Sequence, residues 1–340
     1  MTDPHVHFRD WNQSSKETVQ HGITTAYEAG FNVFFDMPNC NPPLVDRKTI
    51  EQRLELGNSV VKAMANEGKF VSYHVYAGLT NNPEQIKEAV NTYNDLFPAV
   101  CGLKLFASQS TGNMGIIGQD NQMSIYKTLA NLGYEGVLAV HCEKEELFDN
   151  SASRHCDKRC PQSEVASVCD QIYCAQEAGF KGTLHIAHVS TKGALEAIEA
   201  ARQTGLKVTC GATPHHILLN SDSESTIVKM NPPLRCEEDR LAIWNGIFDG
   251  TINWIESDHA PHTLEDKQKG ASGIPGIEGM LMVIKALQQA QMPKSRLEEL
   301  LCTNALNAFG LKVQSSPVPA EITDSMLQSA RYAYPFTAWR

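Results

Sequence analysis

Residues 183–212 read TLHIAHVSTKGALEAIEAARQTGLKVTCGA, and this stretch decides the fold. Its opening residues are rich in apolar and β-branched side chains, as in a buried strand. Residues 192–204 then place apolar side chains at helical spacing, and Gly205 stands where glycine commonly follows a helix. A second strand pattern occupies 207–212. This order predicts two parallel strands joined by a crossover helix.

The same alternation extends along the chain on both sides of this unit. Further helical patterns lie at 46–66, 83–95 and 162–179. Eight strands are expected, at 3–8, 31–37, 70–77, 101–106, 136–142, 183–189, 207–212 and 252–257. Eight strand–helix units favour an α/β fold of the closed (β/α)₈ barrel type. An open doubly wound sheet of the dinucleotide-binding type has a glycine-rich phosphate-binding loop after an early strand, and this sequence has no such loop.

The remaining sequence gives no sign of a second domain. Two more helices are expected at 278–291 and 295–309, so residues 1–310 would form the barrel. The proline-containing segment 311–340 is expected to be an irregular tail packed on that barrel. A length of 340 residues is ordinary for one barrel.

Composition excludes several classes of protein. Hydrophobic residues make up 42% of the chain and charged residues 20%, as in globular proteins. The formal net charge is −10 without a block of Lys and Arg, so neither nucleic acid nor a membrane surface is expected as a partner. No apolar run could cross a bilayer and no secretory signal is visible, so we expect a cytoplasmic protein.

The ten cysteines are expected to be reduced thiols. His155, Cys156 and Cys160 lie close together in the sequence. A structural zinc site would want a second pair of ligands at the right spacing, and Cys169 and Cys174 do not supply it.

Histidines gather at the ends of the predicted strands, where a barrel enzyme carries its catalytic groups. His5 and His7 are two residues apart on a strand, so both imidazoles can face one ion. His141, His188 and Asp258 end three further strands. Imidazole and carboxylate ligands together suit zinc and its neighbours among the divalent metals.

Strand alternation also removes candidates from the ligand set. His185 precedes His188 by three residues and His259 adjoins Asp258, so each is expected to point to the opposite face. We expect a structural or supporting role for the paired His215 and His216 and for Glu143, because the metal sites have enough ligands without them.

Lys104 ends the fourth predicted strand. A lysine that points into a barrel mouth is costly unless something neutralises its charge. This residue alone favours a salt bridge with an acid over carbamylation to an anionic ligand that bridges two metals. The surrounding ligands favour the second.

Nine segments, in chain order, carry a resemblance to a known family. They are DPHVHFRD (3–10), DMPNCNPP (36–43), GLKLF (102–106), HCE (141–143), HIAHVS (185–190), TPHHILL (213–219), KMNPPLR (229–235), SDHAPHT (257–263) and SGIPGIEGML (272–281). Together they resemble the dihydroorotase family of the amidohydrolase superfamily over about residues 3–310.

The resemblance implies a metal-dependent cyclic amide hydrolase with two divalent ions, zinc being the first choice. Carbamylated Lys104 would bridge the two ions, and Asp258 would serve as both ligand and general acid and base. The implied metal ligands are His5, His7, Lys104, His141, His188 and Asp258. The implied substrate contacts are Arg9, Asn39 and His262 for a carboxylate, and Asn231, Pro275 and Gly276 for the ring. In the loop 107–115, Ser110 and Thr111 are candidates for further contacts.

The implied reaction is the reversible cyclisation of N-carbamoyl-L-aspartate to L-dihydroorotate, in de novo pyrimidine biosynthesis, by metal-activated hydroxide. The partner would then be a small molecule, and a homodimer is the base-rate expectation. A hydantoinase, dihydropyrimidinase or allantoinase would share the metal set, but Arg9 and the run DMPN favour a substrate with a carboxylate. A non-catalytic assembly subunit would be expected to have lost ligands.

The chain departs from the family pattern in three places. Asp10-Trp11-Asn12 follows Arg9 where relatives commonly have an acid and then Pro-Gly. Gly211 stands where some relatives place an acid. Almost no sequence precedes the first strand, so we expect little or no flanking β domain.

Overall fold

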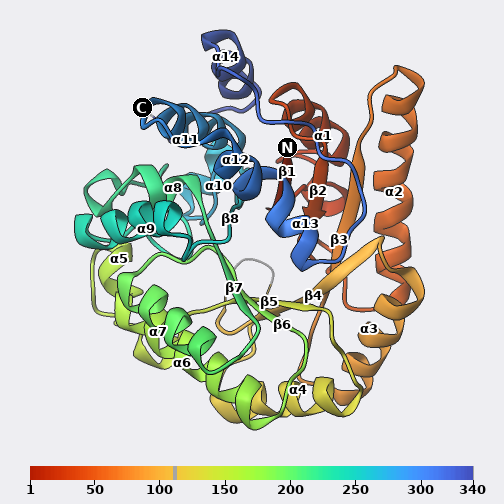
Figure 1. The fold of residues 1–340 in the computed structure, drawn as a ribbon, viewed down its shortest axis with the longest axis vertical. Coiled ribbons are helices and arrows are strands. Elements are labelled where there is room, and N and C mark those ends of the chain that lie inside the picture. Colours follow the sequence, from red (N-terminus) through yellow and green to blue (C-terminus); the bar gives the residue numbers. More distant parts are fainter. Residues whose placement is uncertain (110–112, 340) are drawn as a thin grey trace.

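The computed structural model describes residues 1–109 and 113–339, and eight strands within them form one sheet in chain order. Every neighbouring pair from the first strand to the eighth is parallel. The strands are β1 (Thr2–Val6), β2 (Val33–Asp36), β3 (Ser72–Gly78), β4 (Val100–Phe106), β5 (Val137–His141), β6 (Thr183–Ile186), β7 (Val208–Ala212) and β8 (Trp254–Ile255). Helices surround them (Figure 1), which confirms the predicted (β/α)₈ barrel.

The barrel closes between β8 and β1 without a regular ladder. The backbone N–H of His7 donates to the carbonyl of His259 at 2.8 Å, and the N–H of Ser257 donates to the Asp3 carboxylate at 3.0 Å. These bonds bring together the carboxyl ends of the first and last strands. Two of the segments with predicted metal ligands therefore lie side by side.

Within the described ranges, eight helices of ten or more residues cover the strands. They are α1 (Val19–Glu28), α2 (Arg47–Asn66), α3 (Pro83–Leu96), α4 (Gln119–Asn131), α6 (Pro161–Glu177), α7 (Lys192–Gln203), α9 (Glu237–Asp249) and α11 (Ile277–Gln289). Local sequence sets where several of them begin. The Asp46 side chain accepts from the N–H of Thr49 before α2, and Thr191 caps α7 in the same way.

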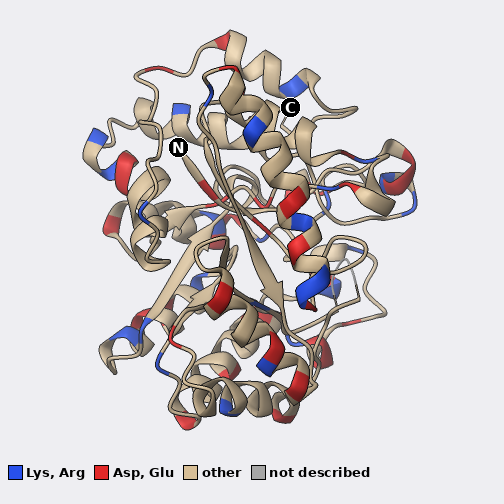
Figure 2. Ribbon diagram, turned by 90° about the vertical axis from the view of Figure 1, so that its right-hand side faces the viewer, with Lys and Arg blue, Asp and Glu red and all other residues tan. Residues whose placement is uncertain are grey.

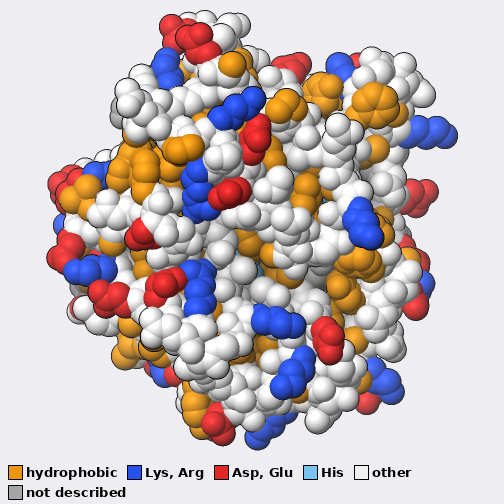
Figure 3. All heavy atoms as spheres, in the orientation of Figure 1, with side chains coloured by type: hydrophobic (Ala, Val, Ile, Leu, Met, Phe, Trp, Pro, Cys, Tyr) orange, Lys and Arg blue, Asp and Glu red, His pale blue; other side chains and the backbone are white. Residues whose placement is uncertain are grey.

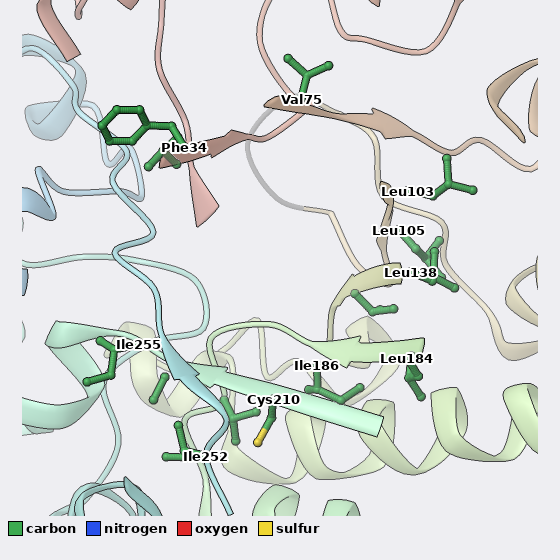
Figure 4. Packing of buried hydrophobic residues seen from close by; sticks show 14 of the residues in the cluster. Phe34, Val75, Leu103, Leu105, Leu138, Leu184, Ile186, Cys210, Ile252 and Ile255 are labelled. Atoms are coloured by element: carbon green, nitrogen blue, oxygen red, sulfur yellow. The ribbon is translucent and has the colours of Figure 1, made fainter. Parts of the chain in front are cut away.

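The main hydrophobic core lies between the strands and the helices. Leu103, Leu138 and Ile186 are fully buried and point away from the centre of the barrel (Figure 4). Burial of each such side chain contributes about 1.5–3 kcal/mol. A second apolar cluster contains Trp254 from β8, Tyr76 from β3 and the side chain of Phe309, which follows the last barrel helix.

Residues 294–308 are helical throughout, as predicted for 295–309, but the middle turn of this helix is π-helical. The segment runs through α12 (Lys294–Glu298), a π-helical turn (Glu299–Thr303) and α13 (Asn304–Ala308). The π-helical turn carries Leu300 and Leu301, both 1% exposed, so the irregular turn keeps its apolar side chains in the core.

The last thirty residues contain a helix, α14 (Asp324–Tyr332), where an irregular tail was expected. The side chains around this helix contact the rest of the barrel. The hydroxyl of Tyr334 donates to Glu17 at 2.7 Å, and the indole of Trp339 donates to the carbonyl of Pro275 at 3.1 Å. Short helices after the strands complete the fold: α5 (His155–Lys158), α8 (Pro214–Leu218) and α10 (Leu264–Gln268).

Charged side chains of both signs are mixed on the surface. Figure 2 shows this mixture along the ribbon, and Figure 3 shows it on the face seen in Figure 1. Across the described ranges, no helix has the length and apolar character needed to cross a membrane. All ten cysteines are free thiols.

Candidate active site

One cavity collects most of the predicted site residues. Its lining comes from the segments at the carboxyl ends of the strands and from the loops that follow them. The lining residues are His5, His7, Arg9, Asn39, Phe106, His141, His188, Asn231, Asp258, Ala260, Ser272 and Gly273. This is the end of a barrel where active sites are found.

His5, His7 and Asp258 form the first group of candidate metal ligands. The Nε2 atoms of His7 and His5 lie 2.9 and 3.4 Å from Oδ1 of Asp258. One ligand atom from each of the three residues lies within 4.8 Å of the others, and all three residues are buried. The structure therefore brings these three residues together, as the sequence predicts.

The charge states of this group suit a divalent ion. Burial raises the pKa of Asp258, but the hydrogen bond with His7 and the nearby His5 outweigh it and hold that pKa well below its ordinary value. Burial, and next the charge of Lys104, lower the pKa of His5 to about 4. An ionised carboxylate and a neutral imidazole are the forms that bind metal.

His141 and His188 form a second group beside the first. Nδ1 of His141 lies 3.1 Å from Nε2 of His188, and the His188 ring centroid is 5.3 Å from that of His5. Burial, and then the charge of His141, lower the pKa of His188 well below its ordinary value. The two predicted metal sites are thus neighbours in one cavity.

Lys104 is fully buried, and its ammonium has no hydrogen-bond partner among residues 1–109 and 113–339. Burial lowers the pKa of Lys104 to about 8. An unpaired buried cation is costly, so the salt-bridge alternative has no support from this geometry. Nδ1 of His188 also lacks a hydrogen-bond partner within the described residues. These unpaired nitrogens fit residues that would hold metal ions.

Glu143 orients His141 rather than adding a ligand. Its Oε2 lies 2.9 Å from Nε2 of His141, and the guanidinium of Arg159 binds both oxygens of the same carboxylate. This is the supporting role expected of Glu143. Arg159 itself was not anticipated from the sequence, because its distance from Glu143 along the chain carries no periodic signal.

His185 faces the barrel interior, so the prediction from strand alternation is wrong. Its ring stacks on Trp254 with centroids 4.4 Å apart, and its Nε2 lies 3.2 Å from Glu256. Strand β6 ends at Ile186, and His188 lies beyond it with φ of 42°, so alternation does not relate the two histidines.

His259 does point away from the cavity, as predicted. Its Nε2 lies 3.0 Å from Glu17, and its Nδ1 accepts from the N–H of Gly276 at 3.0 Å. His215 is buried beside His216, and both of its ring nitrogens lack hydrogen-bond partners in the described part of the chain.

Three of the predicted substrate contacts line the cavity. Arg9 is buried, and its Nε donates to the carbonyl of Pro261 at 3.2 Å, which fixes the guanidinium. Oδ1 of Asn39 lies 2.7 Å from Nδ1 of His7. Oδ1 of Asn231 lies 2.8 Å from Nε2 of His155.

The other predicted contacts lie outside the cavity lining. His262 is buried between Arg9 and Lys16, with Lys16 Nζ 3.2 Å from its Nδ1. The carbonyl of Pro275 accepts from the indole of Trp339, and the N–H of Gly276 donates to Nδ1 of His259. Ser272 and Gly273, a few residues earlier in the same loop, line the cavity instead. Ser110 and Thr111 lie outside the described residues.

Two solved structures illustrate the fold to which this chain is similar. L-Hydantoinase from Arthrobacter aurescens has a TM-score of 0.80 at 20% identity, covering 95% of this chain and 73% of that one. Dihydroorotase from Saccharomyces cerevisiae, solved with 5-fluoroorotic acid, has a TM-score of 0.74 at 17% identity, covering 93% and 85%. At these identities the likeness shows a shared fold.

Sequence comparison reaches further than the fold. No protein-family model matches the chain. A curated relative named dihydroorotase, from Thermococcus kodakarensis, is 32% identical over 330 residues, which cover 96% of this chain and 72% of the relative. With this identity over nearly its whole length, the chain belongs to the dihydroorotase family.

Proposed function

We propose that this protein is a dihydroorotase, which interconverts N-carbamoyl-L-aspartate and L-dihydroorotate. One observation carries the proposal: a single buried cavity brings five candidate imidazole and carboxylate ligands together with Arg9, Asn39 and Asn231. A metal centre beside a fixed guanidinium suits a cyclic amide that bears a carboxylate. A hydantoinase, a dihydropyrimidinase or an allantoinase would share the metal ligands, but these alternatives do not explain the guanidinium of Arg9 in the cavity.

The proposed cofactor is a pair of divalent ions, with zinc as the first choice. His5, His7 and Asp258 would hold one ion, His141 and His188 the other, and Lys104 would join them as a carbamate. When bound, the two ions lower the pKa of water toward neutrality and polarise the carbonyl of the substrate. Burial of Lys104 supports the carbamate, because a lowered pKa makes the neutral amine available to carbon dioxide.

Asp258 is the proposed general acid and base. It stays ionised because His7 and His5 hold its pKa down, and it lines the cavity. In the hydrolytic direction its carboxylate accepts a proton from the attacking water oxygen and delivers that proton to the leaving ring nitrogen. In the synthetic direction the same carboxylate removes the proton from the carbamoyl nitrogen.

Arg9 is the proposed clamp for the substrate carboxylate. Its planar guanidinium can donate two parallel hydrogen bonds, which a lysine cannot do. Arg9 lines the cavity, with its Nε bonded to the carbonyl of Pro261 and one terminal nitrogen, Nη2, 3.5 Å from Nε2 of His262. His262 does not line the cavity, and its proposed role is to support the guanidinium of Arg9.

The biological setting belongs to the same proposal. The enzyme would work in the cytoplasm, in de novo pyrimidine biosynthesis, as a homodimer that takes a small-molecule substrate. Equilibrium sedimentation of the purified protein checks the dimer, and a mass equal to one chain would contradict it.

An ultraviolet assay of dihydroorotate ring opening tests the proposed activity, with hydantoin and allantoin as competing substrates. We expect turnover of dihydroorotate well above that of the other two compounds. Asp258→Asn should lower kcat by roughly 10²–10⁴-fold, because proton transfer then lacks its carrier. Faster turnover of hydantoin than of dihydroorotate would assign the chain to a different activity.

A further inference from the structure

Glu256 is a buried carboxylate that touches the candidate metal ligands but does not line the cavity. It follows β8 and is 0% exposed. Its Oε1 accepts from the backbone N–H of His188 at 2.6 Å and lies 3.6 Å from Nδ1 of His5. Its Oε2 accepts from the indole of Trp254 at 2.9 Å and lies 3.2 Å from Nε2 of His185. One carboxylate therefore contacts a residue from each group of candidate ligands, His5 from the first and His188 from the second.

Gly211, on the neighbouring strand β7, leaves the space that this carboxylate fills. The two strands pair with Gly211 opposite Trp254. A Cβ atom built on Gly211 would lie 2.5 Å from the Glu256 carboxyl carbon, and 2.6 and 2.8 Å from its oxygens. These separations are shorter than real Cβ contacts, so a side chain at position 211 would displace the Glu256 carboxylate from the groups that it bonds.

The contact with His188 holds a strained backbone. His188 has φ of 42°, a left-handed conformation that is unfavourable for residues with a Cβ. A hydrogen bond from its N–H to an ionised carboxylate is of the strong, charge-assisted kind. Glu256 thereby stabilises the turn that carries the His188 ring into the cavity.

The contact with His5 favours one tautomer. At 3.6 Å, Nδ1 of His5 lies slightly beyond hydrogen-bond distance of Glu256, and in the described residues it has no other partner. A carboxylate on that side favours the proton on Nδ1. Nε2 then presents its lone pair beside Asp258, where a metal would bind.

We propose that Glu256 is a positioning residue for both metal sites, and that Gly211 is a glycine because Glu256 needs its space. The supporting carboxylate thus follows β8, and the glycine that leaves room for it lies on β7. The inference rests on the proposed function only in taking His5 and His188 as metal ligands.

Four variants test this inference: Glu256→Gln, Glu256→Ala, Gly211→Glu, and the double variant Gly211→Glu with Glu256→Ala. Metal-free protein is titrated with Zn²⁺ against a chromophoric chelator, and kcat and KM for dihydroorotate are measured separately. Loss of a group that orients metal ligands typically costs about 10–100-fold in affinity, and we expect this loss for both Glu256 variants. Gly211→Glu alone should also weaken binding, because two carboxylates would then compete for one space.

The double variant is the decisive arm. In this variant the glutamate at position 211, on β7, places one carboxylate in the space that Glu256 occupies in the wild type. Its Zn²⁺ affinity should therefore be well above that of Glu256→Ala. In the Glu256 variants kcat should fall while KM changes little, because Glu256 does not line the cavity. Wild-type affinity in Glu256→Gln, or no recovery in a double variant that folds, would overturn the inference.

Glu278→Gln is the matched control, since Glu278 is a buried carboxylate that bonds Arg331 and Thr337, away from the cavity. It should lower thermal stability and leave Zn²⁺ affinity unchanged. Wild-type protein that binds Zn²⁺ without opening dihydroorotate would contradict the proposed function and leave the Glu256 inference standing. Wild-type protein that binds no Zn²⁺ would contradict the inference itself.

Discussion

Among individual residues, Lys104 is the one whose surroundings carry most information. A buried ammonium is normally paired, and this one has no hydrogen-bond partner in the described ranges. The centroid of the Phe106 ring lies 5.1 Å from Nζ of Lys104, which gives only a modest compensation. Conversion of the amine to a carbamate would remove the positive charge and supply metal ligands at once.

Lys104→Ala should therefore lower both metal content and kcat. Added acetate or propionate should restore part of the activity, because a free carboxylate can occupy the vacated space between the metal sites. Metal analysis and the dihydroorotate assay check both effects, with the exposed Lys127→Ala as a control that should match wild type. Full metal content in Lys104→Ala would contradict the bridging role.

Sequence patterns predict which residues meet at the site better than they predict where side chains point. His5 and His7 lie at or just after a regular strand, so alternation applies to them. His188 and Asp258 lie beyond the ends of their strands with φ of 42° and 45°, where alternation has no meaning. The motif predicted that they would be ligands, whereas no periodicity could predict their geometry.

The loop after β8 shows the same limit. Residues Pro275 and Gly276 were expected at the substrate ring, yet Ser272 and Gly273 line the cavity. An isolated bridge pairs His259 with Ile274, and Gly273 has φ of 125° with Ala260 against it. These long-range backbone contacts set the position of the loop, and they leave no local signal in the sequence.

At the scale of elements, the helices with regular apolar spacing were predicted nearly to the residue. The helix expected at 83–95 is α3, Pro83–Leu96, and the one expected at 46–66 is α2, Arg47–Asn66. Capping residues mark such ends locally. The last strand, expected at 252–257, is only Trp254–Ile255, because closure of the barrel against β1 replaces regular pairing there.

The segment after residue 310 is bonded to the buried carboxylate of Glu17, which lies near the N-terminus. Glu17 lies just before α1 and accepts from the hydroxyl of Tyr334, while its Oε1 lies 3.0 Å from His259. We infer from these contacts that residues 311–339 belong to the same domain as the barrel.

This arrangement predicts acid sensitivity with a definite sign. Burial raises the pKa of Glu17, but His259 and His21 outweigh it and lower the pKa to about 2. A depressed carboxyl contributes stability above its unfolded pKa and loses it as the pH falls from about 4.5 toward 2. Glu17→Gln should therefore cost about 2–3 kcal/mol at pH 7, and less as the pH falls through this window.

Urea unfolding of wild type and Glu17→Gln across this pH range measures the difference. The exposed Glu237→Gln serves as control, since Glu237 pairs with Arg240 at the surface, where solvent screens the interaction. A stability difference between wild type and Glu17→Gln that grows on acidification would contradict the assignment.

For the whole molecule, the candidate metal ligands come from five different strands or the residues that follow them. Bound ions would tie β1, β4, β5, β6 and β8 together at one end of the barrel. An ion that binds the native state and not the unfolded chain stabilises it by about 2.7 kcal/mol at a concentration 100 times its dissociation constant. The metal is then part of the stability of the fold.

Removal of metal by a chelator should lower Tm by several degrees, and added Zn²⁺ should reverse the change. Calorimetry of treated and untreated protein checks this, with metal-saturated chelator as the control for effects of the chelator itself. Lys104→Ala should show a smaller change. An unaltered Tm on complete metal removal would show that the ions do not stabilise the barrel.

Trp254 gives this site an optical reporter of its own. Its indole donates to the carboxylate that holds the turn at His188, and its ring stacks on His185 inside the barrel. The fluorescence of a tryptophan responds to the field and to the quenchers around its ring. Trp254 does not line the cavity, so a ligand bound there should change the emission of this tryptophan through Glu256 and His185.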